Sequence, residues 1–288
     1  MSKTKIKEQI FEVENATENF PKYEKILKFH KEVLEILLPL DESIDSWVKI
    51  DLNKKTFECY LDEIITSKKS VNELIKKSDF DIIIITDIVK KIIEILLNNN
   101  ANGDELRVFR EYIEDKEVIV NNAISSILKE DTKWFESHSK KFGIDPSLLL
   151  LIFESPLRPF FEQLSRELEE EIKEIWLESY CPICGRQSNV ARKKKNKRYM
   201  VCSYCGLEYL VDMFECINCG NIDPTKMGFI KLKENEEYEL NYCKVCDHYI
   251  KILDEDLATV KIPYGLEDLL TRKLDVIASS SDFNLKRI

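Results

Sequence analysis

Glycine, proline and histidine are scarce in this 288-residue chain, with 7, 8 and 3 copies respectively. The sequence contains no glycine-rich phosphate loop and no HExxH motif, and His30, His138 and His248 are too dispersed to predict a catalytic set. No apolar run reaches the ~20 residues needed to cross a bilayer. The N-terminal segment also has no apolar core of the secretory-signal kind. We therefore expect a cytoplasmic protein without membrane insertion.

The cysteines and the charges divide the chain near residue 180. Of nine cysteines, Cys59 stands alone, and the other eight fall between Cys181 and Cys246. Residues 1–180 hold 26 Lys and Arg against 37 Asp and Glu, whereas residues 181–288 hold 17 against 16. Because intracellular thiols are kept reduced, this cysteine cluster does not predict a disulfide scaffold. Two different kinds of domain are predicted to meet at this point.

The first part, residues 1–179, has the pattern of an all-α domain. Apolar residues recur every three or four positions, as at Ile26, Phe29 and Val33. Asp145-Pro146 and Ser155-Pro156 each place a capping residue before a proline, which predicts helices over about 146–154 and 156–178. We expect a bundle of about seven to nine helices.

The second of these predicted helices is strongly acidic on one side. We interpret this side as a solvated helix face, with a docking surface for a basic partner as the alternative. The carboxylates are those of Glu162, Glu167, Glu169, Glu170, Glu171, Glu174 and Glu178.

After residue 180 the chain changes to short runs with high β-propensity between paired cysteines. The runs are 199–201, 209–211, 229–232, 238–242 and 249–253, and they predict hairpins. A last amphipathic segment from Leu266 to Ala278 predicts a helix. The expected fold is therefore α+β and multidomain. It comprises a helical domain (1–179), two small rubredoxin-like or zinc-ribbon modules (180–215 and 216–262), and a C-terminal helix and tail (263–288).

Four CxxC pairs carry the clearest chemical signal. Two residues between thiolates let one tight turn direct both sulfurs at a metal about 2.3 Å away. Gly185, Gly206 and Gly220 each follow the second cysteine of a pair, where such a turn needs a positive φ, and Asp247 takes this place in the fourth pair. The pairs are Cys181/Cys184, Cys202/Cys205, Cys216/Cys219 and Cys243/Cys246.

Eight ligands predict two Cys₄ sites and therefore two metal ions per chain. Seventeen residues separate the first two pairs and 23 separate the last two, which is enough for a hairpin, but only 10 separate the middle two. This spacing favours sequential sites, the first two pairs forming one and the last two the other, over interleaved pairing. Tetrahedral S₄ accepts Zn²⁺ or a single iron. A closed Cys₄ shell leaves no position for substrate, which disfavours metal-dependent hydrolysis.

Short motifs between about residues 157 and 275 follow one another in an order that resembles a known family. They are Leu157-Arg158-Pro159 before the acidic helix, Trp176 and Tyr180-Cys181-Pro182-Ile183-Cys184-Gly185 after it, Cys202-Ser203-Tyr204-Cys205 followed by Tyr209, Cys216-Ile217-Asn218-Cys219, Cys243-Lys244-Val245-Cys246 followed by Tyr249-Ile250-Lys251, and the closing Glu267-Asp268-Leu269 and Leu274-Asp275. This order resembles the formate dehydrogenase accessory proteins (FdhE-type). One departure is Met213, which stands where a basic residue is expected before the third pair.

The resemblance implies a cytoplasmic assembly factor and not an enzyme. Its implied partner is the catalytic subunit of a molybdenum- or tungsten-containing formate dehydrogenase, which it would help to mature. If the partner is this catalytic subunit, we expect it to contact the chain near Arg158 and between the two metal sites. A second copy of the chain, forming a homo-oligomer, is a further possible partner, because the sequence does not determine the oligomeric state.

A cluster of cations between the first two pairs suggests a competing function. Zinc ribbons often bind nucleic acids, and six cations in seven residues are a basic patch of the required kind. Against this, the chain has a net charge of −10, which repels phosphate. We interpret the cluster as a hairpin tip that acts, if at all, as a docking site for an acidic patch on a protein client. A rubredoxin-like electron carrier is a third hypothesis. The cluster comprises Arg192, Lys193, Lys194, Lys195, Lys197 and Arg198.

Overall fold

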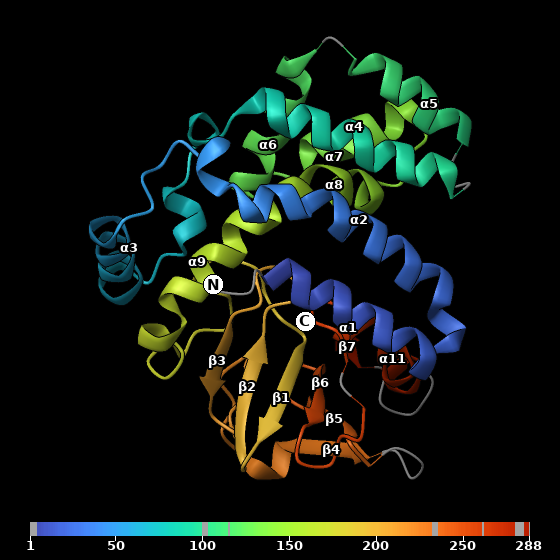
Figure 1. Ribbon diagram of the computed structural model, residues 1–288. Helices are drawn as coiled ribbons and strands as arrows, with labels where there is room; N and C mark the ends of the chain where they lie inside the picture. The colour runs from blue at the N-terminus through green and yellow to red at the C-terminus, as the bar shows by residue number, and fades with distance from the viewer. Residues whose placement is uncertain are drawn as a thin grey trace.

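The computed structural model describes residues 5–99, 103–114, 116–231, 236–260, 262–279 and 285–287, and its first half is helical (Figure 1). Nine α-helices lie in the described residues before residue 180, in agreement with the predicted bundle. They are α1 (Lys5–Asn19), α2 (Glu24–Glu42), α3 (Lys54–Ser67), α4 (Ile82–Asn98), α5 (Gly103–Tyr112), α6 (Glu117–Leu128), α7 (Lys133–Phe142), α8 (Pro146–Glu154) and α9 (Arg158–Ile172).

One of the two predicted side-chain caps, Asp145, begins its helix. The other, Ser155, donates its hydroxyl to the Leu151 carbonyl (2.6 Å) instead, and α9 starts at Arg158 after a 3-10 turn (Ser155–Leu157). The Asp145 carboxylate accepts hydrogen bonds from the backbone N–H groups of Ser147 and Leu148, and Pro146 occupies the first helical position. Helix α8 therefore has the predicted bounds. None of the helices in the described ranges combines the length and the hydropathy needed to span a membrane.

Helix α9 ends at Ile172, earlier than the predicted residue 178. The carbonyl of Lys173 accepts a hydrogen bond from the Leu210 N–H (2.6 Å), and the Trp176 indole donates to the Tyr180 carbonyl (2.6 Å). The chain therefore leaves the helix to bury Trp176 and to reach the sheet. Sequence periodicity could not indicate this end, because the competing contact comes from a strand nearly 40 residues later.

The second half forms one seven-stranded sheet, below the helices in Figure 1. The order is β3-β2-β1-β6-β5-β4, with β7 also paired to β6. Five strands match the predicted runs, although Leu232 lies outside the described residues, and β1 was missed because it is rich in lysine and arginine. The strands are β1 (Val190–Lys194), β2 (Lys197–Val201), β3 (Glu208–Val211), β4 (Met227–Lys231), β5 (Tyr238–Cys243), β6 (His248–Asp254) and β7 (Lys286–Arg287).

A parallel pairing of β1 with β6 joins the strands of the two cysteine modules. Its register runs from Val190 opposite Lys251 to Lys193 opposite Asp254, and all pairs among β1, β2 and β3 or among β4, β5 and β6 are antiparallel. The modules are thus parts of one sheet.

The C-terminal helix is interrupted, where the sequence predicts one segment. Helices α10 (Glu267–Leu270) and α11 (Arg272–Ser279) are separated at Thr271, whose hydroxyl donates to the Glu267 carbonyl (2.6 Å). A small apolar cluster packs α11 against β5 and β6, and it comprises Leu240, Tyr242, Tyr249, Leu274 and Ala278.

The main hydrophobic core continues from the helices into the first cysteine module. Phe161 of α9 packs against Tyr204 with ring centroids 5.6 Å apart, and Ile183 and Leu207 belong to the same buried cluster. The α+β class, with helices before a sheet that carries two cysteine clusters, is confirmed. The division into four domains stays a prediction.

Candidate metal centres

The eight paired cysteines form two groups of four, in the predicted sequential grouping. Within each group all Sγ atoms lie within 4.8 Å of one another. The Sγ–Sγ distances are 3.4 Å for Cys181–Cys205, 3.3 Å for Cys184–Cys202, 3.7 Å for Cys216–Cys246 and 3.8 Å for Cys219–Cys243. A tetrahedron of 2.3 Å metal–sulfur bonds has edges of about 3.8 Å. Each group therefore fits one tetrahedral metal ion; we call them site 1 (Cys181, Cys184, Cys202, Cys205) and site 2 (Cys216, Cys219, Cys243, Cys246).

Each CxxC turn has the backbone conformation that its sequence predicts. The residue after the second cysteine donates its N–H to the carbonyl of the first cysteine, over 2.8 to 2.9 Å. This closure requires a positive φ, which glycine adopts without a Cβ clash and aspartate tolerates better than most residues. The observed φ values are +77° at Gly185, +79° at Gly206, +69° at Gly220 and +59° at Asp247, so the prediction is confirmed.

Site 1 is enclosed between the helical part and the sheet. All four of its cysteines are buried. The N–H groups of Val71 and Asn72 donate to the carbonyls of Pro182 and Ile183 (2.8 and 2.9 Å), and the Tyr264 hydroxyl donates to the Cys202 carbonyl (3.1 Å). The first turn is therefore fixed by a segment more than 100 residues earlier.

Sequence reasoning missed this contact between Val71, Asn72 and the first cysteine turn. A local signal for the segment was present, because Ser70 and Glu73 form a capping box in which the Glu73 carboxylate accepts from the Ser70 N–H (3.0 Å). That signal predicts the start of a short helix, but it does not indicate what the helix start contacts.

Enclosure also changes the chemistry of the site 1 thiols. Burial raises the pKa of Cys181 and of Cys205 well above the usual thiol range. Because metal ligation requires thiolates, loading of site 1 must release protons from these buried groups.

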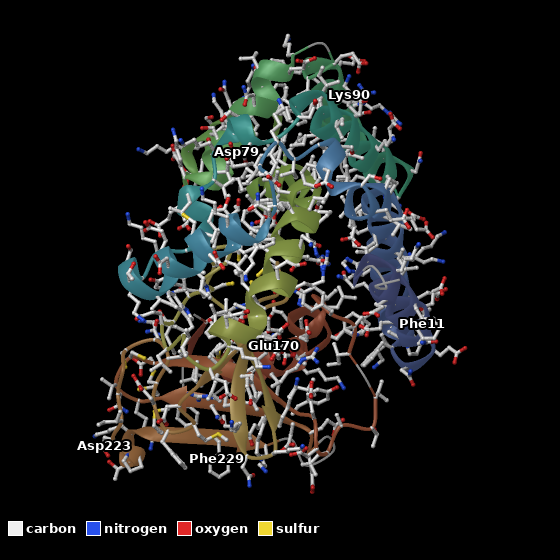
Figure 2. The ribbon with its side chains drawn as sticks, turned by 60° about the vertical axis from the view of Figure 1, so that its left-hand side comes forward. Phe11, Asp79, Lys90, Glu170, Asp223 and Phe229 are labelled. Carbon is white, nitrogen blue, oxygen red and sulfur yellow. The ribbon has the colours of Figure 1, made fainter. Side chains whose placement is uncertain are left out.

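Site 2 lies at the surface. Cys219 is exposed and Cys246 is partly exposed, whereas Cys216 and Cys243 are buried. Figure 2 shows Asp223 and Phe229, both near site 2 in the chain, at the lower edge of the molecule. Large apolar side chains around site 2 are also exposed: Phe214 (71%), Ile222 (74%), Phe229 (69%) and Val245 (57%). The two sites thus have the same ligands but opposite surroundings.

Competition with a strong chelator should release the two metals in two phases. Because Cys219 is exposed and site 1 is enclosed, we expect site 2 to lose its metal at least about tenfold faster. A colorimetric chelator assay on metal-loaded protein measures both phases. Cys219→Ser should remove only the fast phase and Cys184→Ser only the slow one. A single phase for the wild type would contradict the assignment.

Arg158, expected near a partner contact, lies mostly inside the protein. Its side chain is 12% exposed and its Nε donates to Oε1 of Glu162 (2.8 Å), a side chain with no exposure. Its Nη2 donates to Oε1 of Gln9 (3.0 Å), and the guanidinium stands over the Tyr264 ring at 5.3 Å. Arg158 therefore links α1, α9 and the segment before α10. Glu162 is also a correction, since the predicted solvated acidic face does not include it.

Two arginines of the basic cluster are buried in the same way. Arg192 forms ion pairs with Glu255 (2.7 Å) and Glu267 (2.6 Å). Arg198 donates to the carbonyls of Asp212 and Glu215. These two side chains therefore bind the sheet to neighbouring segments, and their charged groups have little contact with solvent.

The lysines of the cluster form the hairpin between β1 and β2. Lys195 and Asn196 turn the chain with φ values of +46° and +61°, as a type I′ turn requires. Lys193 pairs with Asp254 (2.8 Å), Lys194 with Glu208 (2.6 Å), and Lys197 with Glu174 (3.4 Å). Acidic side chains from three other segments thus pair with these three lysines. The sequence predicted the hairpin, but it did not predict that acidic side chains would pair with the lysines.

The remaining cysteine and two of the histidines lie apart from metal ligation. Cys59 is exposed on α3. His248 is a neighbour of site 2, and its Nδ1 donates to the Cys246 carbonyl (2.7 Å). Burial beside Arg158 lowers the pKa of His30 to about 3, so that its imidazole is neutral.

Fold and sites together define an α+β protein with two Cys₄ clusters, each able to hold one metal ion. No family model matches the chain. It is 25% identical to the "Protein FdhE homolog" of Aquifex aeolicus (strain VF5) over 272 residues, which cover 92% of this chain and 88% of that protein. The crystal structure of the FdhE protein from Pseudomonas aeruginosa has the same fold, with a TM-score of 0.63 at 16% identity over 98% of this chain and 95% of that one. The predicted resemblance to FdhE-type proteins is confirmed, and it extends over the helical half.

Proposed function

We propose that this chain is a cytoplasmic accessory protein that binds the catalytic subunit of a formate dehydrogenase and assists its maturation. The similarity to an FdhE homologue over 92% of the chain supports this function. The observation that carries it is the contrast between the two sites. Site 1 is built into the core, whereas site 2 has an exposed thiol and a rim of exposed apolar side chains, as a partner-binding module requires.

The metal ions at both sites are Zn²⁺ or iron in this proposal, and their role is to fix the shape of the modules. A metal bound by four thiolates supplies a cross-link between two turns. Because four protein ligands complete the tetrahedron, no position is left for substrate, which supports a protein that is not an enzyme.

The two competing functions have less support. Nucleic-acid binding depends on the basic cluster, but Arg192 and Arg198 are buried and three of the four lysines form ion pairs with acidic side chains. An electron carrier requires iron at site 2 and reversible reduction. Elemental analysis and voltammetry of anaerobically purified protein distinguish this case.

Co-purification from the native host tests the proposed function. Tagged wild-type protein should retain the formate dehydrogenase catalytic subunit, and Cys219→Ser should lose it because site 2 unfolds locally without its fourth thiolate. Cys59→Ser is the matched control, since it changes another exposed cysteine outside both sites, and it should bind as the wild type does. Recovery of RNA polymerase or ribosomal components in place of the oxidoreductase subunit would disprove the proposal, and equal retention by Cys219→Ser would disprove its dependence on metal.

A further inference from the structure

Strand β4 is an open edge of the sheet, next to site 2. It is the last strand in the order, and among the described residues no strand pairs with its outer side. The Lys244 N–H donates to the Lys226 carbonyl (2.8 Å), which makes these two residues, just after β5 and just before β4, a hydrogen-bonded pair of the ladder. Because bonded and non-bonded pairs alternate in an antiparallel ladder, Met227, Phe229 and Lys231 direct their backbone N–H and C=O groups outward.

The opposite edge of the sheet is not available in the same way. At β3 the Leu210 N–H is already bonded to the Lys173 carbonyl at the end of α9. Natural proteins usually protect an edge by covering it, by charged side chains such as lysine, by proline, or by a bulge. Strand β4 contains no proline and its register with β5 has no interruption; its one lysine, Lys231, disfavours pairing with a basic or apolar strand but not with an acidic one, so within the described residues its outward groups stay open to an acidic segment.

The side chains around β4 show which kind of segment would fit. Phe229 is 69% exposed, and the exposed Ile222 and Val245 extend the apolar surface towards site 2. Three exposed lysines border this surface: Lys226 before the strand, Lys231 at its end and Lys244 in the fourth CxxC turn. Of these, Lys231 lies 3.7 Å from the Glu239 carboxylate.

We propose that β4 binds an extended segment of a partner protein, which adds a strand to the sheet and carries acidic residues beside an apolar one. The outward backbone groups supply the strand pairing, Phe229 the apolar contact, and the lysines the charge complement. A second copy of this chain fits less well, because its own β4 (Met227–Lys231) carries no acidic residue to complement the lysines. The partner's identity as the formate dehydrogenase catalytic subunit rests on the proposed function; the edge itself does not.

Selection from a random peptide display library against the full, metal-loaded chain tests the edge directly. We expect enriched peptides with acidic residues and alternating apolar ones. Phe229→Pro should weaken their binding at least about tenfold, because it removes an outward N–H at an edge position where proline is tolerated. Phe229→Ala should weaken binding less, since it keeps the backbone donor. Phe11→Ala is the matched control, because Phe11 is 64% exposed on the outer side of α1 (Figure 2), and it should have no effect.

Three outcomes would overturn the inference. They are an absence of enriched peptides, equal binding by Phe229→Pro with both metals retained in native mass spectrometry, and self-association of the wild type that Phe229→Pro abolishes. The same variants are then assayed with purified formate dehydrogenase catalytic subunit. If the peptides depend on Phe229 but the subunit does not bind the wild type, the proposed function fails and the edge site stands. If the subunit binds wild type and Phe229→Pro equally, the proposed function stands and its assignment to β4 fails.

Discussion

Cys184→Ser is expected to remove one metal ion and to lower the free energy of unfolding of the whole chain by more than about 3 kcal/mol. Cys184 is buried in the same core as Phe160, Phe161 and the other buried apolar residues of α9. Its turn also accepts the hydrogen bonds from Val71 and Asn72. Losing the metal therefore leaves a buried gap and unpaired backbone groups between the helices and the sheet. Denaturant titration followed by far-ultraviolet circular dichroism measures the loss.

Cys219→Ser is the control for this prediction. It also removes one metal, but from the surface site, so the unfolding midpoint of the helices should stay close to that of the wild type. The sequence alone predicts a helical half that stays folded after either change, because the cysteines and the helices occupy separate parts of the chain. Because site 1 shares a hydrophobic core with the helices, we expect the loss of its metal to destabilise the helices as well. Equal midpoints for Cys184→Ser and Cys219→Ser would show that the core contact contributes little.

Arg158→Ala is expected to destabilise the chain by about 3–5 kcal/mol, the range for breaking a buried ion pair. The variant removes the cation beside the fully buried Glu162 carboxylate, which keeps its hydrogen bonds from the Gln9 amide at 3.0 Å. It also removes the guanidinium that packs over Tyr264. The metal content should stay at two ions, because neither site uses these side chains. Thermal and denaturant unfolding with native mass spectrometry test both statements.

A double variant separates the ion pair from simple loss of packing. Arg158→Ala combined with Glu162→Gln should recover about 1–2 kcal/mol, because the neutral amide is less costly to bury without a cation. If the double variant is as unstable as the sum of the two single ones, the destabilisation comes from lost packing and not from an unpaired charge.

The metal sites could be predicted from the sequence because their determinants are local. Two residues between cysteines and a following glycine specify a turn within five residues, and Asp247 could be placed by the same argument. The strands could be predicted for a similar reason, since their β-branched and aromatic residues lie between turn signals. Strand β1 was missed because its cations are unusual in a strand, and their acidic partners come from residues about 60 to 75 positions later.

Charged residues show most clearly where sequence reasoning stops. Arg158 and Glu162 have the one-turn spacing of an ordinary surface pair, yet Gln9 and Tyr264 from both ends of the chain enclose them. Their burial follows from the contacts that Gln9 and Tyr264 make with α9, which no local pattern encodes. The basic cluster was misjudged for the same reason. Its residues form a run of positive charge in the sequence, but in the fold most of them form ion pairs with acidic side chains from distant segments.

The parallel pairing of β1 with β6 imposes an order on folding during synthesis. Ribosomes release the chain from the N-terminus, and domains generally fold as their residues emerge. Helices α1–α9, the four ligands of site 1 and strands β1–β3 have all left the exit tunnel once residue 211 has emerged, but the side of β1 that pairs with β6 stays open until residues 251–254 follow. Strands β4 and β5 leave the tunnel before β6, which must join them to β1. A nascent chain arrested before residue 248 would therefore carry the four ligands of site 1 and an incomplete sheet, and the surface around site 2 would form only after β4, β5 and β6 have emerged.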